Sequence, residues 1–363
     1  MNLDLNTKNF QLYFNLTSDS YTAYNLDNTF AIFKSVNKII MVIYGNIEKS
    51  IISYNLINKQ KINEIKNAHQ NTISNIRHHL DIINKRDLFL TISARDYNVK
   101  VWNMNNYECL LNLNNIHYIH SKNYGHKLYS ACFLIYNNQN YIITSDCSDF
   151  IYTSNSDPIK IFDLNGNKIN EIKHTTNNNT LFIDTYFDEK NSNNYILTGN
   201  YGFVESYDYN NNRVYHKYTH YNNSNKYEHT YSYESLIIST LDDINNEKKT
   251  LKLIATCSDG HIKFWNFHSG EMLQIIKVFG VFLHSICLIN KNFLVVACGD
   301  KSIKIVDIKK GKVIKVLFGS DDVICIKSFI HPSFGICLIS QEKSEFYGIN
   351  NNHISLWVDK KFF

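Results

Sequence analysis

The chain has 363 residues, of which 44% are hydrophobic and 14% aromatic, enough apolar material for a large core. Its 37 Lys and Arg residues stand against 33 Asp and Glu residues, so the formal net charge is only +4. This balance excludes the strongly charged surface of a dedicated nucleic-acid or membrane binder and favours partners recognised by shape.

Seven similar segments follow one another along the chain, about 40 to 60 residues apart, a period that is typical of repeat architectures. Each is a short run of alternating residues that ends in an aromatic or branched residue, and most continue with Asn or Asp. The seven endings are Tyr54-Asn55, Trp102-Asn103, Phe162-Asp163, Tyr207-Asp208, Trp265-Asn266, Val306-Asp307 and Trp357-Val358.

Each repeat predicts four short strands separated by polar turns. In the sixth repeat these are residues 284–289, 293–298, 301–307 and 312–317. We expect the innermost strands, such as FLVVAC at 293–298, to be almost wholly apolar because neighbouring sheets cover both of their faces. Four-stranded sheets repeated around an axis form a β-propeller.

The predicted fold is therefore all-β, a seven-bladed β-propeller of four-stranded antiparallel blades in a single domain of residues 1–363. After residues 353–358 the seventh repeat is too short for a fourth strand. We expect residues 10–16 to supply that strand, close the ring and remove its exposed edges. The predicted blades cover residues 28–67, 69–113, 128–174, 180–220, 229–278, 283–318 and 322–358.

Two repeats carry the most specific motif, because Asp96 and Asp259 each lie six residues before Trp102 and Trp265. This pattern resembles the WD-repeat family, and strings such as DGHIKFWNFHSGEML are similar to a protist-expanded subgroup of single-propeller members. The resemblance implies a hydrogen-bonded network of Asp, His, a Ser or Thr hydroxyl and Trp within a blade. For the Trp102 repeat these are Asp96, His69 and either Ser93 or Thr91, while Asp259, Trp265 and Trp357 belong to the networks of other blades.

The eight cysteines lack any Cys-x-x-Cys pair, which favours buried, reduced thiols in an intracellular protein. Residues 1–20 lack a basic start and an apolar block, so we expect no signal peptide. The sequence contains no run of about 18 apolar residues, so we expect no membrane span. Localisation in the cytoplasm follows, with the nucleus as the alternative.

Residues that could carry chemistry are few. The histidine pairs His117/His120 and His216/His220 lack neighbouring ligands at metal-site spacing, so no metal is predicted. The adjacent acids at 242–243 and 321–322 fall in polar connectors, where turn capping or solvent exposure is the simpler interpretation. No Gly-rich phosphate loop or nucleophile elbow occurs. No catalytic residue, cofactor or enzymatic activity is predicted.

Two surfaces are candidates for binding. Tyrosines recur nine times between residues 201 and 233 beside basic residues, a composition that could bind a peptide or stack on single-stranded RNA. Strand preference for Tyr explains the same run without function. The turns expected around the channel form the candidate partner-binding face, which comprises Arg95, Tyr97, Tyr201, His261, Lys301 and Asp321.

The favoured function is a non-enzymatic scaffold for protein–protein interaction, or a subunit of a multiprotein assembly, with other proteins or peptides as partners. An RNA- or ribosome-associated binding module is the alternative, and a propeller hydrolase is a weaker one. No homo-oligomer is implied. The sequence does not identify the partner.

Overall fold

The computed structural model describes residues 10–18, 30–46, 48–93, 96–116, 126–148, 158–173, 180–200, 202–219, 235–241, 249–256, 260–278, 282–346 and 349–359. Every regular element in this part of the chain is a β-strand. The chain divides into two compact units, residues 20–232 and residues 1–19 with 233–363. Each unit is a series of four-stranded antiparallel sheets, which makes the fold an all-β propeller fold.

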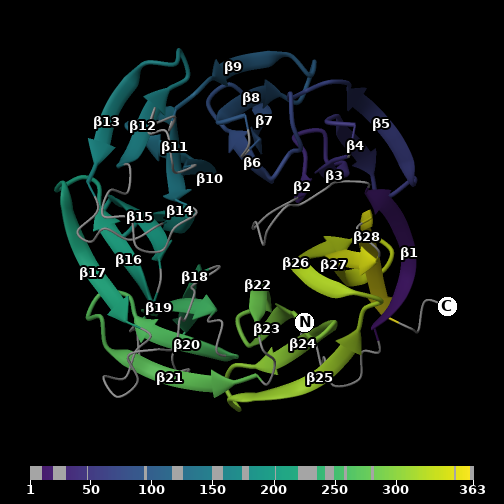
Figure 1. Ribbon diagram of the computed structural model, residues 1–363. Helices are drawn as coiled ribbons and strands as arrows, with labels where there is room; N and C mark the ends of the chain where they lie inside the picture. Colours follow the sequence, from purple (N-terminus) through teal and green to yellow (C-terminus); the bar gives the residue numbers. More distant parts are fainter. Residues whose placement is uncertain are drawn as a thin grey trace. The chain divides into compact units, whose positions relative to one another are not determined.

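Residues 20–232 form four sheets, each built from four strands that are consecutive in sequence. The first two contain β2 (Phe30–Lys34), β3 (Ile40–Gly45), β4 (Ile51–Asn55), β5 (Gln60–Ile65), β6 (Asn75–Asp81), β7 (Arg86–Ser93), β8 (Asn98–Asn103) and β9 (Cys109–Leu113). The next two contain β10 (His126–Tyr136), β11 (Gln139–Ser148), β12 (Ile159–Asp163), β13 (Lys168–Ile172), β14 (Thr180–Asp188), β15 (Asn193–Asn200), β16 (Phe203–Asp208) and β17 (Arg213–Thr219). Within this unit the fourth strand of each sheet, such as β9 or β13, lies on the outer side (Figure 1).

The other unit contains three sheets. Two of them comprise β18 (Ser235–Leu241), β19 (Lys249–Thr256), β20 (His261–Asn266), β21 (Met272–Lys277), β22 (Leu283–Asn290), β23 (Phe293–Cys298), β24 (Ser302–Asp307) and β25 (Lys312–Phe318). The third comprises β26 (Asp322–His331), β27 (Gly335–Phe346), β28 (Ile349–Asp359) and β1 (Phe10–Ser18), in the order β1-β28-β27-β26.

Strand β1 completes this third sheet from the start of the chain. It pairs antiparallel with β28, from Phe10 opposite Asp359 to Ser18 opposite Asn352, with a register shift between Leu12 and Phe14. Phe10 is 7% exposed and packs in the same cluster as Trp357. The last sheet thus has four strands, although the final repeat itself supplies three.

Strand β23 shows why some strands are apolar throughout. Leu294, Val296 and Cys298 pack in a cluster with residues of β20 to β22, whereas Val295 and Ala297 pack in a second cluster with β26 and β27. Alternate side chains of a strand point to opposite faces, so two covered faces require an unbroken apolar run. The run FLVVAC was expected to be an innermost strand; it is instead the second strand, behind β22.

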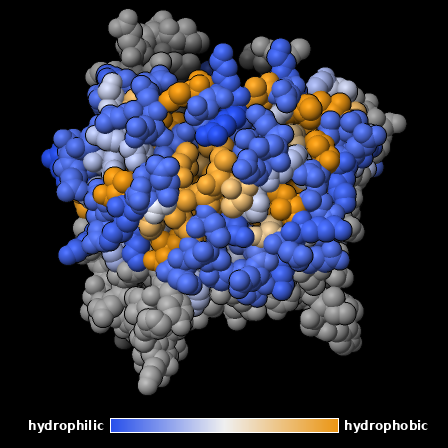
Figure 2. Space-filling model, turned by 90° about the horizontal axis from the view of Figure 1, so that it is seen from above, coloured by the Kyte–Doolittle hydropathy of each residue, from blue (hydrophilic) through white to orange (hydrophobic). Residues whose placement is uncertain are grey.

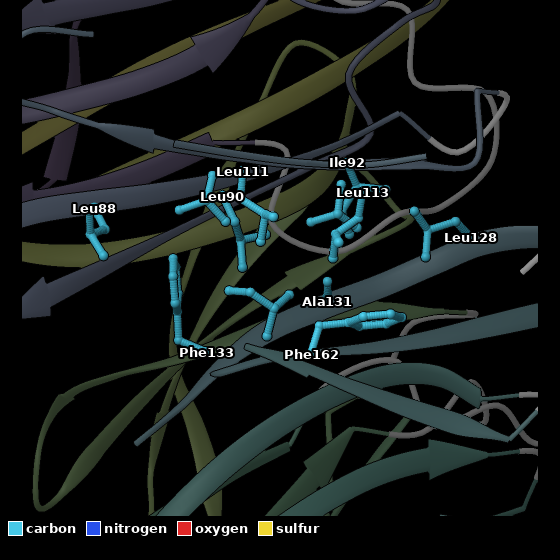
Figure 3. Packing of buried hydrophobic residues seen from close by; sticks show 12 residues of the cluster. Leu88, Leu90, Ile92, Leu111, Leu113, Leu128, Ala131, Phe133 and Phe162 are labelled. Carbon is cyan, nitrogen blue, oxygen red and sulfur yellow. The ribbon is translucent and has the colours of Figure 1, made fainter. Parts of the chain in front are cut away.

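The same arrangement joins the sheets of residues 20–232. Leu88, Leu90 and Ile92 on β7 pack with Phe133 on β10 and Phe162 on β12 in one buried cluster, and Figure 3 shows these side chains facing one another between the two sheets. Burial of apolar surface at such interfaces is the main force that stacks neighbouring blades.

The expectation that the cysteines are buried is confirmed for most of those in the described residues. Five described cysteines are buried and free, but Cys109 is exposed, because its position on the outer strand β9 faces solvent. Left-handed turn positions are occupied as often by lysine as by asparagine, for example at Asn137 and Asn138. Among the described residues there is no helix of the length and hydrophobicity needed to cross a membrane.

Candidate partner-binding site

A polar pocket of about 690 Å³ lies in the unit of residues 20–232, where the sheets β2–β5 and β6–β9 meet. Its lining combines six amide side chains with two lysines, one histidine and one carboxylate. These residues are Lys49, Asn67, His69, Gln70, Asp96, Asn98, Lys100, Asn112, Asn114 and Asn115. Amides offer both hydrogen-bond donors and acceptors, which suits a ligand that itself carries both kinds of group, such as a peptide backbone.

A network at one wall of the pocket fixes the orientation of His69. Its Nε2 lies 2.8 Å from Thr91 Oγ1, and the Trp102 Nε1–H donates to the same oxygen over 2.9 Å. Burial lowers the pKa of His69 to about 3, so the ring is neutral at physiological pH. Its Nδ1 has no hydrogen-bond partner among the described residues.

The structure decides one alternative that the sequence left open, and it differs from the expectation in one other detail. Thr91, and not Ser93, provides the hydroxyl, because Thr91 lies two residues beyond Phe89, the residue paired with Trp102. Asp96 does not bond to His69. Its Oδ2 accepts the backbone N–H groups of Gln70 and Asn71, both at 2.8 Å, and its Oδ1 accepts the Asn71 side-chain amide.

These bonds make Asp96 a clamp on the connection between β5 and β6. Burial raises the pKa of Asp96, but the hydrogen bonds from Asn71 and Gln70 outweigh this effect and hold the pKa below its usual value. Lys100 fastens the same connection, because its Nζ donates to Ala68 O over 2.6 Å. The pocket wall is therefore held from two sides, as a preformed binding site requires.

A second pocket of about 490 Å³ lies on the other side of β9 and shares Asn112 and Asn114 with the first. Its lining is more apolar and includes Leu111, Leu113, Ile116, Phe162, Asn165, Gly166, Lys160 and Lys168. The strand β9 thus separates a polar pocket from a partly apolar one.

The free edge of β9 has no charged residue to protect it. The other outer strands of this unit carry Lys61 on β5, Lys168 on β13, and Arg213 and Lys217 on β17, whereas β9 reads CLLNL. Charged residues on an edge strand discourage pairing with another chain. The edge of β9 is accordingly the outer strand of this unit best suited to accept an added strand.

A second polar cluster lies in the unit of residues 1–19 and 233–363. The Trp357 Nε1–H donates to Ser340 Oγ over 2.8 Å, and Ser340 Oγ–H donates to Glu342 Oε1 over 3.3 Å. Glu342 Oε2 accepts both the backbone N–H and the hydroxyl of Ser320, at 2.8 and 2.9 Å. A Cβ at Gly319 would come within 2.8 Å of the same carboxylate, so a larger residue there would displace the Glu342 side chain.

This cluster contains a serine, a histidine and an acid, but it cannot act as a proton relay. His353 Nε2 lies 2.9 Å from Ser320 Oγ and 3.2 Å from Glu342 Oε2. In a relay the hydroxyl and the acid bind different ring nitrogens. Here both contact the same nitrogen, so the arrangement supports a structural role.

Two residues of the predicted partner-binding face lie close together. Lys301 Nζ lies 3.6 Å from Asp321 Oδ1, next to the Ser320 cluster. Tyr97, with φ of 55°, is half-buried beside the first pocket, and its carbonyl accepts the Ile116 N–H over 3.4 Å. His261 begins β20 and is half-buried. Arg95, Tyr201 and Asp259 lie outside the described residues, while Trp265 is buried in β20.

The remaining candidates do not assemble into a site. Of the four histidines considered for metal binding only His216 is described, and no group of three or more potential ligands occurs in the described part of the chain. Asp242 and Asp243 lie outside it. Tyr218 is fully buried, and Tyr215 packs against Tyr195 with ring centroids 4.9 Å apart. The described tyrosines of residues 201–233 therefore pack within the sheets and offer no open stacking platform.

Sequence reasoning missed the pockets beside β9, because no motif marks them. The signal that was present is the lack of charge in residues 109–113 compared with the other outer strands. Only the spatial arrangement shows that these residues separate two pockets.

No family model matches the chain. Over 80 residues it is 32% identical to the U3 small nucleolar RNA-associated protein 21 homolog of Schizosaccharomyces pombe. The match covers 22% of this chain and 8% of that protein.

Proposed function

We propose that this protein is a non-enzymatic interaction scaffold of the WD-repeat type, in which the two units together form a closed seven-bladed ring. The pairing of β1 with β28 supports closure, because it gives the last sheet four strands. The four sheets of one unit and the three of the other supply the required blades.

The edge of β9 binds an extended peptide segment of a partner protein. The observation that carries this proposal is the uncharged edge strand between a polar and a partly apolar pocket. A peptide added to a sheet edge gains main-chain hydrogen bonds, while its side chains point alternately into pockets on either side. Asn112 and Asn114 line both pockets and are placed to bond to the peptide backbone.

A pull-down with tagged protein tests this function. Replacing the two shared amides, in Asn112→Ala/Asn114→Ala, is expected to lower recovery of the captured partner proteins at least tenfold. Asn58→Ala/Gln60→Ala, which removes two exposed amides at β5, is the matched control and should behave like the wild type. Equal recovery with the β9 variant would contradict the proposed site.

An RNA-associated role is the second candidate. It is favoured by the match to a small nucleolar RNA-associated protein of fission yeast, and it would place the protein in the nucleus. Against it stands the low net charge. Nuclease treatment and a raised salt concentration separate the two functions, because RNA-mediated retention is lost under both.

A further inference from the structure

Large apolar side chains are exposed at one end of the sheets in residues 20–232. They are Val36 (43% exposed), Ile82 (73%), Ile83 (60%), Ile135 (46%) and Phe187 (52%). All lie in or beside the turns that join the first and second strands of the four sheets. We call these five residues the turn ridge. Exposed apolar residues also occur elsewhere, in patches among hydrophilic ones (Figure 2), so their exposure alone does not indicate a site.

Hydrogen bonds join the neighbouring sheets close to these turns. The Val36 N–H donates to Asp87 Oδ2 over 2.7 Å, which ties the first turn to the second. His79 Nε2 lies 2.8 Å from Asn140 Oδ1, beside the third turn. The Thr185 hydroxyl donates to Phe133 O over 2.8 Å. Thr185 lies two residues before Phe187, and Phe133 lies two residues before Ile135.

The charges around the first two turns are unbalanced. Asp81 accepts hydrogen bonds from Arg86 and Asn84, and Asp87 is paired with His78 at 2.8 Å. Both carboxylates are buried, and Arg86 pairs with Asp81, so neither acid is exposed beside these turns. Lys38 and Lys85 are exposed and have no carboxylate partner within the described ranges.

Both lysines occupy left-handed backbone positions, as three other lysines of the described residues do. Lys38 and Lys85 have φ of 63° and 49°, in the left-handed region that disfavours most residues with a Cβ. At the third turn the same region is occupied by Asn137 and Asn138, which tolerate it better. Turn geometry alone would favour Asn at residues 38 and 85 as well.

We infer that the turn ridge binds an acidic, amphipathic peptide segment of a partner protein. The apolar side chains of this segment lie on Ile82, Ile83 and Val36, and its carboxylates pair with Lys38 and Lys85. Charge complementarity selects an acidic partner over a basic one. This surface is separate from the edge of β9 and does not depend on the function proposed for that edge.

Fluorescence anisotropy with two synthetic peptides tests the inference. One peptide combines Leu and Phe with Glu and Asp, and its counterpart has Lys at every acidic position. The acidic peptide is expected to bind the full chain, more weakly at high salt, while the basic one does not. Absence of binding, or equal binding of both peptides, would overturn the inference.

Two variants locate the binding. Lys38→Asn/Lys85→Asn should weaken binding of the acidic peptide at least fivefold, with a melting temperature equal to or above that of the wild type, because Asn suits these turns. Ile82→Ser/Ile83→Ser should have a similar effect on binding. The control variants Lys309→Asn and Asn112→Ala/Asn114→Ala should bind normally. Unchanged affinity in the lysine variant, or lost affinity in the controls, would refute the assignment.

Discussion

Thr91 illustrates how one buried hydroxyl can support two rings at the residue scale. Its Oγ1 accepts the Trp102 indole N–H and contacts His69 Nε2, and all three residues are buried. A buried polar group that loses its partner costs about 1 to 3 kcal/mol. Removing the hydroxyl leaves two ring nitrogens without a partner.

We therefore expect Thr91→Val, which preserves the shape of the side chain, to lower the free energy of unfolding by about 2 to 3 kcal/mol. Ser93→Ala should lower it less, because Ser93 contacts neither ring nitrogen. Urea denaturation followed by tryptophan fluorescence measures both. A larger effect at Ser93 than at Thr91 would mean that the network is misassigned.

Glu342 makes stability depend on pH. Burial raises its pKa, but hydrogen bonds from His353 and Ser355 outweigh this and hold the pKa at about 2. The stability that ionised Glu342 contributes is complete above its usual pKa of 4.5 and is lost as the pH falls toward 2. The hydrogen bond to Glu342 raises the pKa of His353, so the stability from protonated His353 is complete below pH 6.5 and is lost as the pH rises through the raised pKa.

Replacing the carboxylate in Glu342→Gln should cost on the order of 3 kcal/mol at pH 7, since one pKa unit corresponds to about 1.4 kcal/mol. The difference from the wild type should narrow as the pH falls below 4.5. Denaturant titrations at several pH values between neutral and acid measure it. A constant difference over this range would show that ionisation of Glu342 does not stabilise the fold.

At the scale of elements, the outer strands differ in how they are protected. Strand β1 covers β28 and buries Phe10 against the last sheet, while lysines protect β5 and β13. Without β1, the edge of β28 would present unpaired backbone groups, which favour aggregation. Strand β9 has neither protection, which is why we place the partner peptide there.

Removal of residues 1–20 should therefore lower the melting temperature and produce concentration-dependent aggregates, because an edge and an apolar surface are exposed together. Removal of residues 1–8, which leaves β1 intact, is the control. Thermal melts and light scattering provide the readouts. A truncation that melts like the full chain and stays monomeric would argue against the closing role of β1.

At the scale of the whole molecule, the period and alternation of the repeats predicted the four-stranded sheets well. A strand whose two faces are both covered by neighbouring sheets needs an apolar run, and such runs can be recognised in the sequence. The finer pairings were less predictable. Thr91 and Ser93 both point to the same side of β7, so only the register with Trp102 distinguishes them. The turn ridge combines residues from four repeats, which no local pattern connects.

The measurement that tests the central claim most directly is hydrogen–deuterium exchange of the protein alone and with a partner protein captured in the pull-down. We predict slower exchange upon binding in peptides that cover residues 67–70, 96–100 and 109–116, because the partner adds a strand to β9 and fills the pockets beside it. Unchanged exchange in all three peptides, despite stoichiometric binding of the partner, would contradict the account.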